Sequence, residues 1–194
     1  MKNPLTRFSS TLALVAPTVA LFASHADAAV YIKFDGVDGE SASVDHKGWI
    51  IIESMSWGGI TPVSGTGGGG AGKVSFKDFS FSQRINKASP KLFLMCATGQ
   101  TVPTVTLSVT RMVGGAEVGY YKVVLKDVLI SSISGANTPG AGGTATSGDR
   151  PQESLSLNFT KIEVKYTPID DVTGAQGPTE TSGEIAAERV VATN

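Results

Sequence analysis

The chain has 194 residues, of which 41% are hydrophobic and 17% charged, and its formal net charge at pH 7 is −1. This near-balanced charge, with no cluster of Lys or Arg, excludes nucleic acid as a main partner, because proteins that bind it need a basic face. The length predicts one domain with short additions. The 23 glycines indicate turns between many short strands.

The N-terminal residues 1–28 have the pattern of a cleavable signal peptide. Lys2 and Arg7 make the N-terminal region positively charged, and a mainly apolar run follows at residues 12–23. This run is shorter than the roughly 20 apolar residues that span a bilayer, so an uncleaved membrane anchor is the less favoured interpretation. The cleavage motif consists of Ala26, Ala28 and, after the cleaved bond, Ala29. We expect export to the periplasm or the cell exterior, with no stable membrane insertion after processing.

The first strands are predicted from runs of β-forming apolar residues. Residues 29–34 predict one strand and residues 49–57 a second. A long loop follows at residues 58–72 and ends in a glycine tract. Residues 73–85 then alternate between apolar and polar side chains, which predicts another strand.

The alternation of apolar residues slips by one position near residues 77–78, 126–127 and 160–161. One interpretation is a bulge within a long strand, because bulges restore the phase and bend a sheet toward a barrel. The other is a break between two short strands. We favour bulges, and therefore expect long and strongly curved strands.

One short helix and one hairpin are clearly marked. Ser89 is predicted as the N-cap of the helix, Pro90 as its first residue and Gly99 as its C-terminal glycine. Residues 103–113 and 117–133 then predict two strands, which Gly114-Gly115 joins as a hairpin.

The second half of the chain contains two polar segments. Residues 135–148 form a loop rich in Gly, Thr, Ser and Ala, and residues 170–183 are polar with Pro, Gly and Thr. We therefore expect one barrel domain over residues 29–169 and a flexible C-terminal tail over residues 170–194.

Three patterns could carry chemistry, and we interpret none of them as a site. Residues 67–73 resemble a phosphate-binding loop, but Val74 replaces the required hydroxyl and a strand follows instead of a helix. His46 is expected in a solvated loop, because the processed chain has too few His and Cys residues for a structural zinc site. The acidic pair at residues 170–171 could bind Ca²⁺ weakly, but it lacks regularly spaced oxygen ligands.

Cys96 and the two tryptophans are also expected to be structural. Cys96 is the only cysteine, so it forms no internal disulfide, and we expect a small buried side chain. Trp49 and Trp57 would face the same side of a regular strand. Core filling is the favoured interpretation, and a sugar-binding face is the alternative. We therefore predict no enzyme, no cofactor and no metal.

Several sequence blocks together resemble one family. They occur in order over residues 57–58, 67–73, 76–81, 89–92, 125–132 and 155–159, with Cys96 and Gly99 after the fourth block. In these blocks the chain resembles the Hcp family (haemolysin-coregulated protein). The resemblance extends over residues 30–168.

The resemblance implies a mainly β, tail-tube-like barrel of two curved sheets with one short flanking α-helix. It also implies that six copies close into a ring with a lumen, and that rings stack into the inner tube of a type VI secretion machine. The implied partners are other copies of the chain, a spike protein and small effector cargo in the lumen. The resemblance places the bonding surface at exposed strand edges.

By position, residues 58–72 match the family loop that reaches the neighbouring ring, and we call them the stacking loop. Its predicted contact residues are Gly58, Gly59, Ile60, Thr61, Pro62, Val63, Gly67, Gly68, Gly69, Gly70 and Gly72. The chain departs from the family in its signal peptide and in a C-terminus without the usual Gly-Trp-Asp type of ending. The alternative function is an exported β-barrel that binds a ligand or glycan without assembling into tubes.

Overall fold

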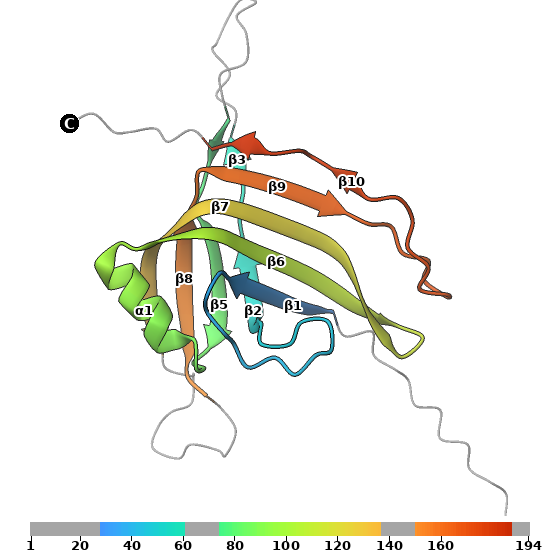
Figure 1. The fold of residues 1–194 in the computed structure, drawn as a ribbon, viewed down its shortest axis with the longest axis horizontal. Coiled ribbons are helices and arrows are strands. Elements are labelled where there is room, and N and C mark those ends of the chain that lie inside the picture. Colours follow the sequence, from blue (N-terminus) through green and yellow to red (C-terminus); the bar gives the residue numbers. More distant parts are fainter. Residues whose placement is uncertain (1–27, 61–73, 137–149, 188–194) are drawn as a thin grey trace, which may run out of the picture.

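The computed structural model describes residues 28–60, 74–136 and 150–187 of the chain, which form a mainly β fold with one helix (Figure 1). In these ranges, no helix is long and apolar enough to cross a membrane. The elements are β1 (Ala29–Phe34), β2 (Ile50–Ser56), β3 (Gly59–Ile60), β4 (Ser75–Phe76), β5 (Phe79–Arg84), α1 (Ser89–Thr98), β6 (Thr101–Val113), β7 (Ala116–Ala136), β8 (Gln152–Asn158), β9 (Lys161–Tyr166), β10 (Glu180–Thr181) and β11 (Ile185–Ala186).

Six strands close into an antiparallel barrel in the order β7-β6-β1-β2-β5-β8, because β8 pairs with β5 on one side and with β7 on the other. Strand β9 continues the sheet beside the first half of β7, and β3 and β4 form a separate small sheet. The predicted fold, a barrel of curved sheet with one short flanking helix, is confirmed.

The longest hairpin of the barrel follows directly from its turn residues. Gly114 and Gly115 have φ values of +58° and +81°, the left-handed pair that a two-residue hairpin turn requires. The turn pairs Val113 with Ala116, and the ladder between β6 and β7 extends as far as Thr101 and Leu129. This predicted hairpin is confirmed.

Asp127 is the point at which the long strand β7 changes partner. Its φ is +48°, a conformation that is uncommon for a residue other than glycine. Residues 121–126 pair with β9, whereas residues 129–136 pair with β8. At the same corner, the hydroxyl of Thr160 donates to the Asp127 carboxylate at 2.8 Å. The slip at residues 126–127 therefore lies within one long, continuous strand, as predicted. The ladder with β6 keeps its register there, so the predicted bulge is absent.

The other two slips are breaks between strands, so the prediction of bulges is wrong there. At residues 77–78 the chain leaves the small sheet, where β4 pairs with β3, and enters the barrel as β5. At residues 159–160 it passes from β8 to β9, which pair with different parts of β7. A bulge interrupts a ladder that continues on both sides of it, and here no ladder continues across the break.

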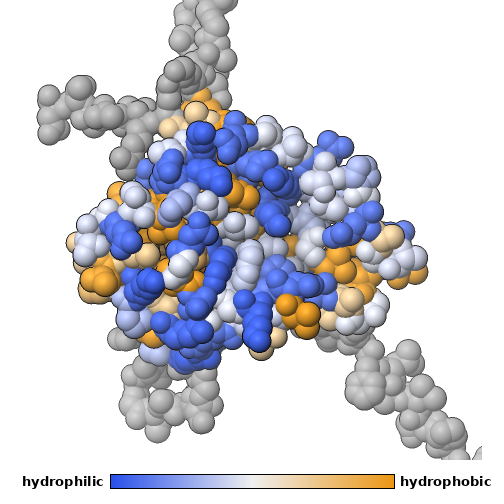
Figure 2. Space-filling view, viewed as in Figure 1, coloured by the Kyte–Doolittle hydropathy of each residue, from blue (hydrophilic) through white to orange (hydrophobic). Residues whose placement is uncertain are grey.

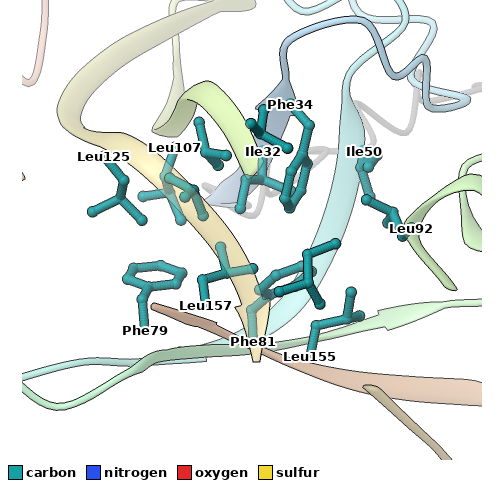
Figure 3. Packing of buried hydrophobic residues seen from close by; sticks show 14 of the residues in the cluster. Ile32, Phe34, Ile50, Phe79, Phe81, Leu92, Leu107, Leu125, Leu155 and Leu157 are labelled. Atoms are coloured by element: carbon teal, nitrogen blue, oxygen red, sulfur yellow. The ribbon is translucent and has the colours of Figure 1, made fainter. Parts of the chain in front are cut away.

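The interior of the barrel is filled by apolar side chains from all six of its strands (Figure 3). The helix α1 adds Leu92 and Met95 to the same cluster. Burial of a Leu or Phe side chain stabilises the fold by about 1.5–3 kcal/mol, so the closed barrel holds together without disulfides.

The predicted helix is confirmed, but its N-cap is wrong. Gly99 ends the helix with φ +66°, as expected. At the start, Ala88 occupies the cap position and Ser89 makes no capping bond. The Ser89 hydroxyl instead donates to the buried carboxylate of Glu153 at 2.5 Å. A buried carboxylate needs hydrogen-bond donors, which explains why the side chain points inward.

Within the segment assigned from the sequence to a flexible tail, residues 180–187 lie along β9. Strand β10 pairs with residues 165–166 and β11 with residues 161–162. Between them, the Ser182 N–H donates to the Val164 carbonyl at 2.9 Å. The tail covers the outer edge of β9, so the exposed edge of the sheet passes to the short strands β10 and β11. That exposed strand edges form the bonding surface stays a prediction.

Candidate assembly surfaces and polar sites

His46 is buried, so the prediction of a solvated loop is wrong for this residue. Its ring stacks on Tyr31 with 4.4 Å between the ring centroids and meets the edge of Trp49 at 4.9 Å. Its Nε2 is hydrogen-bonded to the hydroxyl of Ser108 at 2.9 Å. Burial lowers the pKa of His46 below its ordinary value of 6.5, although the nearby Glu117 carboxylate partly opposes this.

The two tryptophans do not form one binding face. Trp49 lines a cavity of about 400 Å³ together with His46, Tyr120 and Lys122. Trp57 lines a different one beside the base of the stacking loop. A register shift between Ile52 and Ser54 separates them along β2. The paired sugar-binding face considered from the sequence is therefore absent, and Trp49 alone remains in an aromatic and polar cavity.

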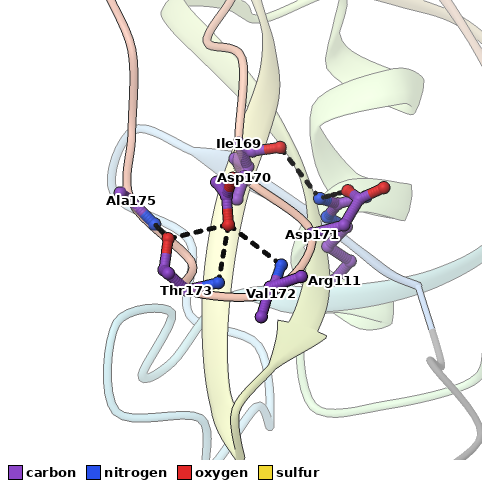
Figure 4. Close-up of polar contacts among 7 residues, drawn as sticks. All are labelled: Arg111, Ile169, Asp170, Asp171, Val172, Thr173 and Ala175. Atoms are coloured by element: carbon purple, nitrogen blue, oxygen red, sulfur yellow. Dashed lines mark hydrogen bonds and ion pairs between the residues drawn. The ribbon is translucent and has the colours of Figure 1, made fainter.

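The acidic pair at residues 170–171 is occupied by contacts within the chain (Figure 4). One carboxylate oxygen of Asp170 accepts bonds from the N–H groups of Val172 and Thr173 and from the Thr173 hydroxyl. Asp171 is paired with Arg111. These bonds hold the turn that starts the tail. Because both carboxylates are already bonded within the chain, they are poorly placed to bind Ca²⁺.

Metal and thiol chemistry find little support in the described parts of the chain. Residues 28–60, 74–136 and 150–187 contain no group of three or more His, Cys, Asp or Glu side chains that could hold a metal ion. Cys96 is a free thiol on α1, partly buried and packed against the core. Residues 67–72 and Lys73 of the phosphate-loop pattern lie outside the described residues.

The base of the stacking loop is a short antiparallel ladder between β3 and β4. A Cβ atom at Gly59 would lie 3.1 Å from the side chains of Val74 and Phe76, so this position favours glycine. Phe76 in turn packs near Phe159, with 5.9 Å between ring centroids. The ladder fixes where the loop leaves the barrel. Its other predicted contact residues, at positions 61–63, 67–70 and 72, lie outside the described residues.

The helix α1 carries an apolar stripe on its solvent side. Pro90, Phe93, Leu94 and Ala97 are all exposed, and their spacing places them on one face of a helix. Phe93 is 62% exposed and Leu94 59%. Figure 2 shows apolar surface over the region of α1 among hydrophilic residues. We call these four residues the helix stripe. Adjacent exposed apolar residues of this size are typical of a contact with another protein.

In the described part of the chain, the barrel interior is filled by apolar side chains and the helix stripe is exposed. The model of the family described as "Type VI secretion system effector, Hcp" matches residues 31–166. The chain belongs to the Hcp family. The resemblance inferred from the sequence blocks is therefore confirmed, and it covers the barrel except the first two residues of β1.

Several Hcp relatives are similar in sequence or in structure. Protein hcp1 of Pseudomonas aeruginosa is 38% identical over 96 residues, which cover 50% of this chain and 55% of that protein. The match thus spans about half the length of this relative. A solved structure of a type six secretion system protein has a TM-score of 0.70 and 29% identity, over 80% of this chain and 92% of that one. Hcp1 from Salmonella typhimurium has a TM-score of 0.60 and 27% identity, over 81% and 92%.

Two features of this Hcp chain were missed from the sequence alone. The helix stripe had a visible signal, because residues 90, 93, 94 and 97 recur at helical spacing. Its outward direction could be known only from the inward positions of Leu92 and Met95. The coverage of β9 by the tail had no such signal, since β10 and β11 each have two residues.

Proposed function

We propose that this chain is a structural subunit that assembles into rings of six copies, which stack into a tube with a central channel. The single observation that carries the proposal is the Hcp family match over residues 31–166, which includes the barrel except the first two residues of β1. The subunit performs no reaction of its own. Its work is done by contacts between copies of the chain, and an open head-to-tail repeat of rings can extend indefinitely along one axis.

Two surfaces supply these contacts. The helix stripe, centred on Phe93 and Leu94, provides apolar area for the contact between neighbours in a ring. The stacking loop, whose two ends form the β3–β4 ladder, provides the contact between rings. The glycines of the loop allow the backbones of two rings to approach closely.

Export is the second part of the proposal. Residues 1–28 act as the cleavable signal peptide, with Ala26, Ala28 and Ala29 at the cut, and the subunit reaches the periplasm or the exterior. Residues 29–169 form the assembling domain, and residues 170–194 form its C-terminal extension. A spike protein and small effectors in the channel are the further partners that the family suggests. Mass spectrometry of protein recovered outside the cytoplasm should give an N-terminus at Ala29, and a chain that keeps residues 1–28 would refute export by this route.

The assembly proposal is tested by negative-stain electron microscopy of residues 29–194. We expect rings with a central hole, and tubes at higher protein concentration. Dispersed particles of the size of one subunit at every concentration would overturn the proposal.

The cavity beside Trp49 favours one second candidate, an exported module that binds a small glycan. Its volume is about 400 Å³, and its lining combines Trp49 and Tyr120 with polar groups such as Lys165 and Gln176, a mixture that suits sugars and other polar ligands. The protein is titrated with oligosaccharides while its tryptophan fluorescence is followed. This experiment distinguishes the binding module from the assembling subunit. A saturable change that Trp49→Ala removes, in a protein that forms no rings, would favour the binding module.

A further inference from the structure

The cavity beside Trp49 is built from segments that are distant in the sequence. Strands β6, β7 and β9 form its floor, and the loop before β2 and the tail form its walls. Leu107 and Val123 point into the core, so their neighbours Ser108 and Lys122 point outward, toward the cavity. Its volume of about 400 Å³ is at the small end of the range for ligand sites. We call it the outer cavity.

Two lysines lie side by side in the floor of the outer cavity. Lys122 of β7 and Lys165 of β9 are directly opposite each other in the ladder, and like charges at opposed positions are destabilising. The ammonium group of Lys165 pairs with Glu163 at 3.0 Å, whereas Lys122 has no ion pair within residues 28–60, 74–136 and 150–187. The lining contains one carboxylate, that of Asp45, among its described residues. An anion in the cavity would give Lys122 a counter-charge and relieve the repulsion.

Aromatic rings supply the apolar part of the lining. Trp49 and Tyr120 are half-buried, so part of each ring remains accessible from the cavity. The Trp49 ring meets His46 at right angles, and the Tyr120 ring meets Tyr166 in the same way at 6.4 Å. These contacts fix the rings before a ligand arrives. The negatively polarised face of a fixed aromatic ring suits the C–H groups of a sugar ring.

The polar lining includes a hydrogen-bonding atom without a partner. The Nδ1 atom of His46 is buried and makes no hydrogen bond, while Nε2 is bonded to Ser108. A hydroxyl group can donate or accept, so a hydroxyl-rich ligand suits this atom whichever ring nitrogen carries the proton. On the tail side, Gln176 donates to the Gly119 carbonyl at 3.0 Å. This bond holds the tail in place as a wall of the cavity.

We infer that the outer cavity binds a sugar ring that carries a carboxylate, with the ring against Trp49 and the carboxylate against Lys122. The inference rests on the second candidate function, glycan binding beside Trp49, and names the class of sugar. It does not require ring assembly and does not exclude it. The lining residues include none from the helix stripe and none from the described part of the stacking loop.

The test compares D-glucuronic acid with D-glucose, which has the same ring without the carboxylate. Residues 29–194 are titrated with each sugar at low ionic strength, and the heat of binding is measured by calorimetry. We expect saturable binding of glucuronic acid that is about tenfold tighter than that of glucose, the effect of one hydrogen bond to a charged group. Inorganic phosphate is the third probe and should bind more weakly than glucuronic acid, because it cannot stack on Trp49.

Two substitutions and one control locate the binding. Lys122→Gln should weaken the binding of glucuronic acid about tenfold and leave that of glucose unchanged, a difference that a merely structural role would not produce. Lys122 is exposed, so the variant should unfold at the parental temperature. Trp49→Ala should abolish the binding of both sugars. Lys87→Gln, which removes an exposed lysine outside the cavity, should change neither affinity.

Each contrary result overturns a named part of the inference. Equal binding of the two sugars, or an unchanged affinity of Lys122→Gln, would refute the selection of a carboxylate and leave the glycan-binding candidate standing. Phosphate binding as tight as that of glucuronic acid would refute the sugar. No saturable binding of either sugar at millimolar concentration would refute the site and the glycan-binding candidate together. Electron microscopy of the same samples decides ring assembly separately, because the affinities can be measured with or without rings.

Discussion

The hydroxyl of Ser89 donates a hydrogen bond of 2.5 Å to the carboxylate of Glu153, and this bond joins the start of α1 to β8. The same carboxylate oxygen accepts a bond of 2.6 Å from the Gln83 side chain on β5. Glu153 is buried, so water cannot replace either donor. One carboxylate therefore fixes the helix against two strands of the barrel.

Glu153→Ala should destabilise the subunit by about 1–3 kcal/mol, because the substitution leaves two buried donors without an acceptor. Urea unfolding followed by circular dichroism measures this change in the free energy of unfolding. The control is Glu184→Ala, which removes an exposed carboxylate paired with Lys161 and should change stability by at most about 1 kcal/mol. Equal effects of the two substitutions would contradict the role of Glu153.

His46 should make the stability of the subunit depend on pH. Its pKa in the folded chain lies below the ordinary value of 6.5, so the unfolded chain binds more protons at acidic pH. The contribution is complete above about pH 6.5 and is lost as the pH falls from there toward the folded pKa. The charged groups that act on His46 are Glu117, Asp45 and Lys122.

His46→Phe keeps an aromatic ring between Tyr31 and Trp49 and should flatten this dependence as the pH falls below about 6.5. Thermal unfolding at a series of pH values provides the measurement. Glu117 accepts bonds from Ser43 and Thr110, which help to lower its pKa below the ordinary 4.5, so its contribution is lost in a separate, more acidic range. An identical slope for the parent and His46→Phe would exclude His46 as the cause.

Deletion of residues 65–70 from the stacking loop should leave the barrel folded and abolish tubes. The deleted residues lie beyond the β3–β4 ladder, so the thermal unfolding midpoint should change little. Electron microscopy at a concentration where the parent forms tubes is the readout. The matched control replaces residues 65–70 by an equally long Ser-Gly segment and should keep more stacking than the deletion. Tubes of parental length from the deleted protein would refute the role of the loop.

The double substitution Phe93→Ser and Leu94→Ser should weaken ring formation at least tenfold, which corresponds to about 1.4 kcal/mol. Both side chains are exposed in the subunit, so its stability should stay within about 0.5 kcal/mol of the parent. The dissociation constant of the ring is measured by dilution and light scattering. Val172→Ser, at a site that is 85% exposed on the tail, is the control for loss of exposed apolar area. Unchanged ring formation in the double variant would exclude the helix stripe as the contact.

The sequence predicted those parts of the fold that depend on local patterns. The alternation along residues 103–113 and the pair Gly114-Gly115 were sufficient for the long hairpin, and Pro90 with Gly99 was sufficient for the helix. The phase slips were ambiguous because a bulge and a break shift the alternation equally. At Asp127 the strand stays paired with β6 on its other side, whereas no ladder continues across residues 77–78 or 159–160. This difference is a tertiary property.

The surfaces were harder to predict because their members are distant in sequence. His46 lies between polar neighbours, and its burial depends on Tyr31 and Ser108 from other strands. The family resemblance, in contrast, was evident from ordered sequence blocks and required no structure.

The central claim is that residues 29–194 assemble with copies of themselves. Sedimentation velocity over a concentration series tests it most directly. The account predicts a species with the mass of six subunits, and faster species as rings stack at higher concentration. A single boundary at the mass of one subunit throughout the series would contradict it.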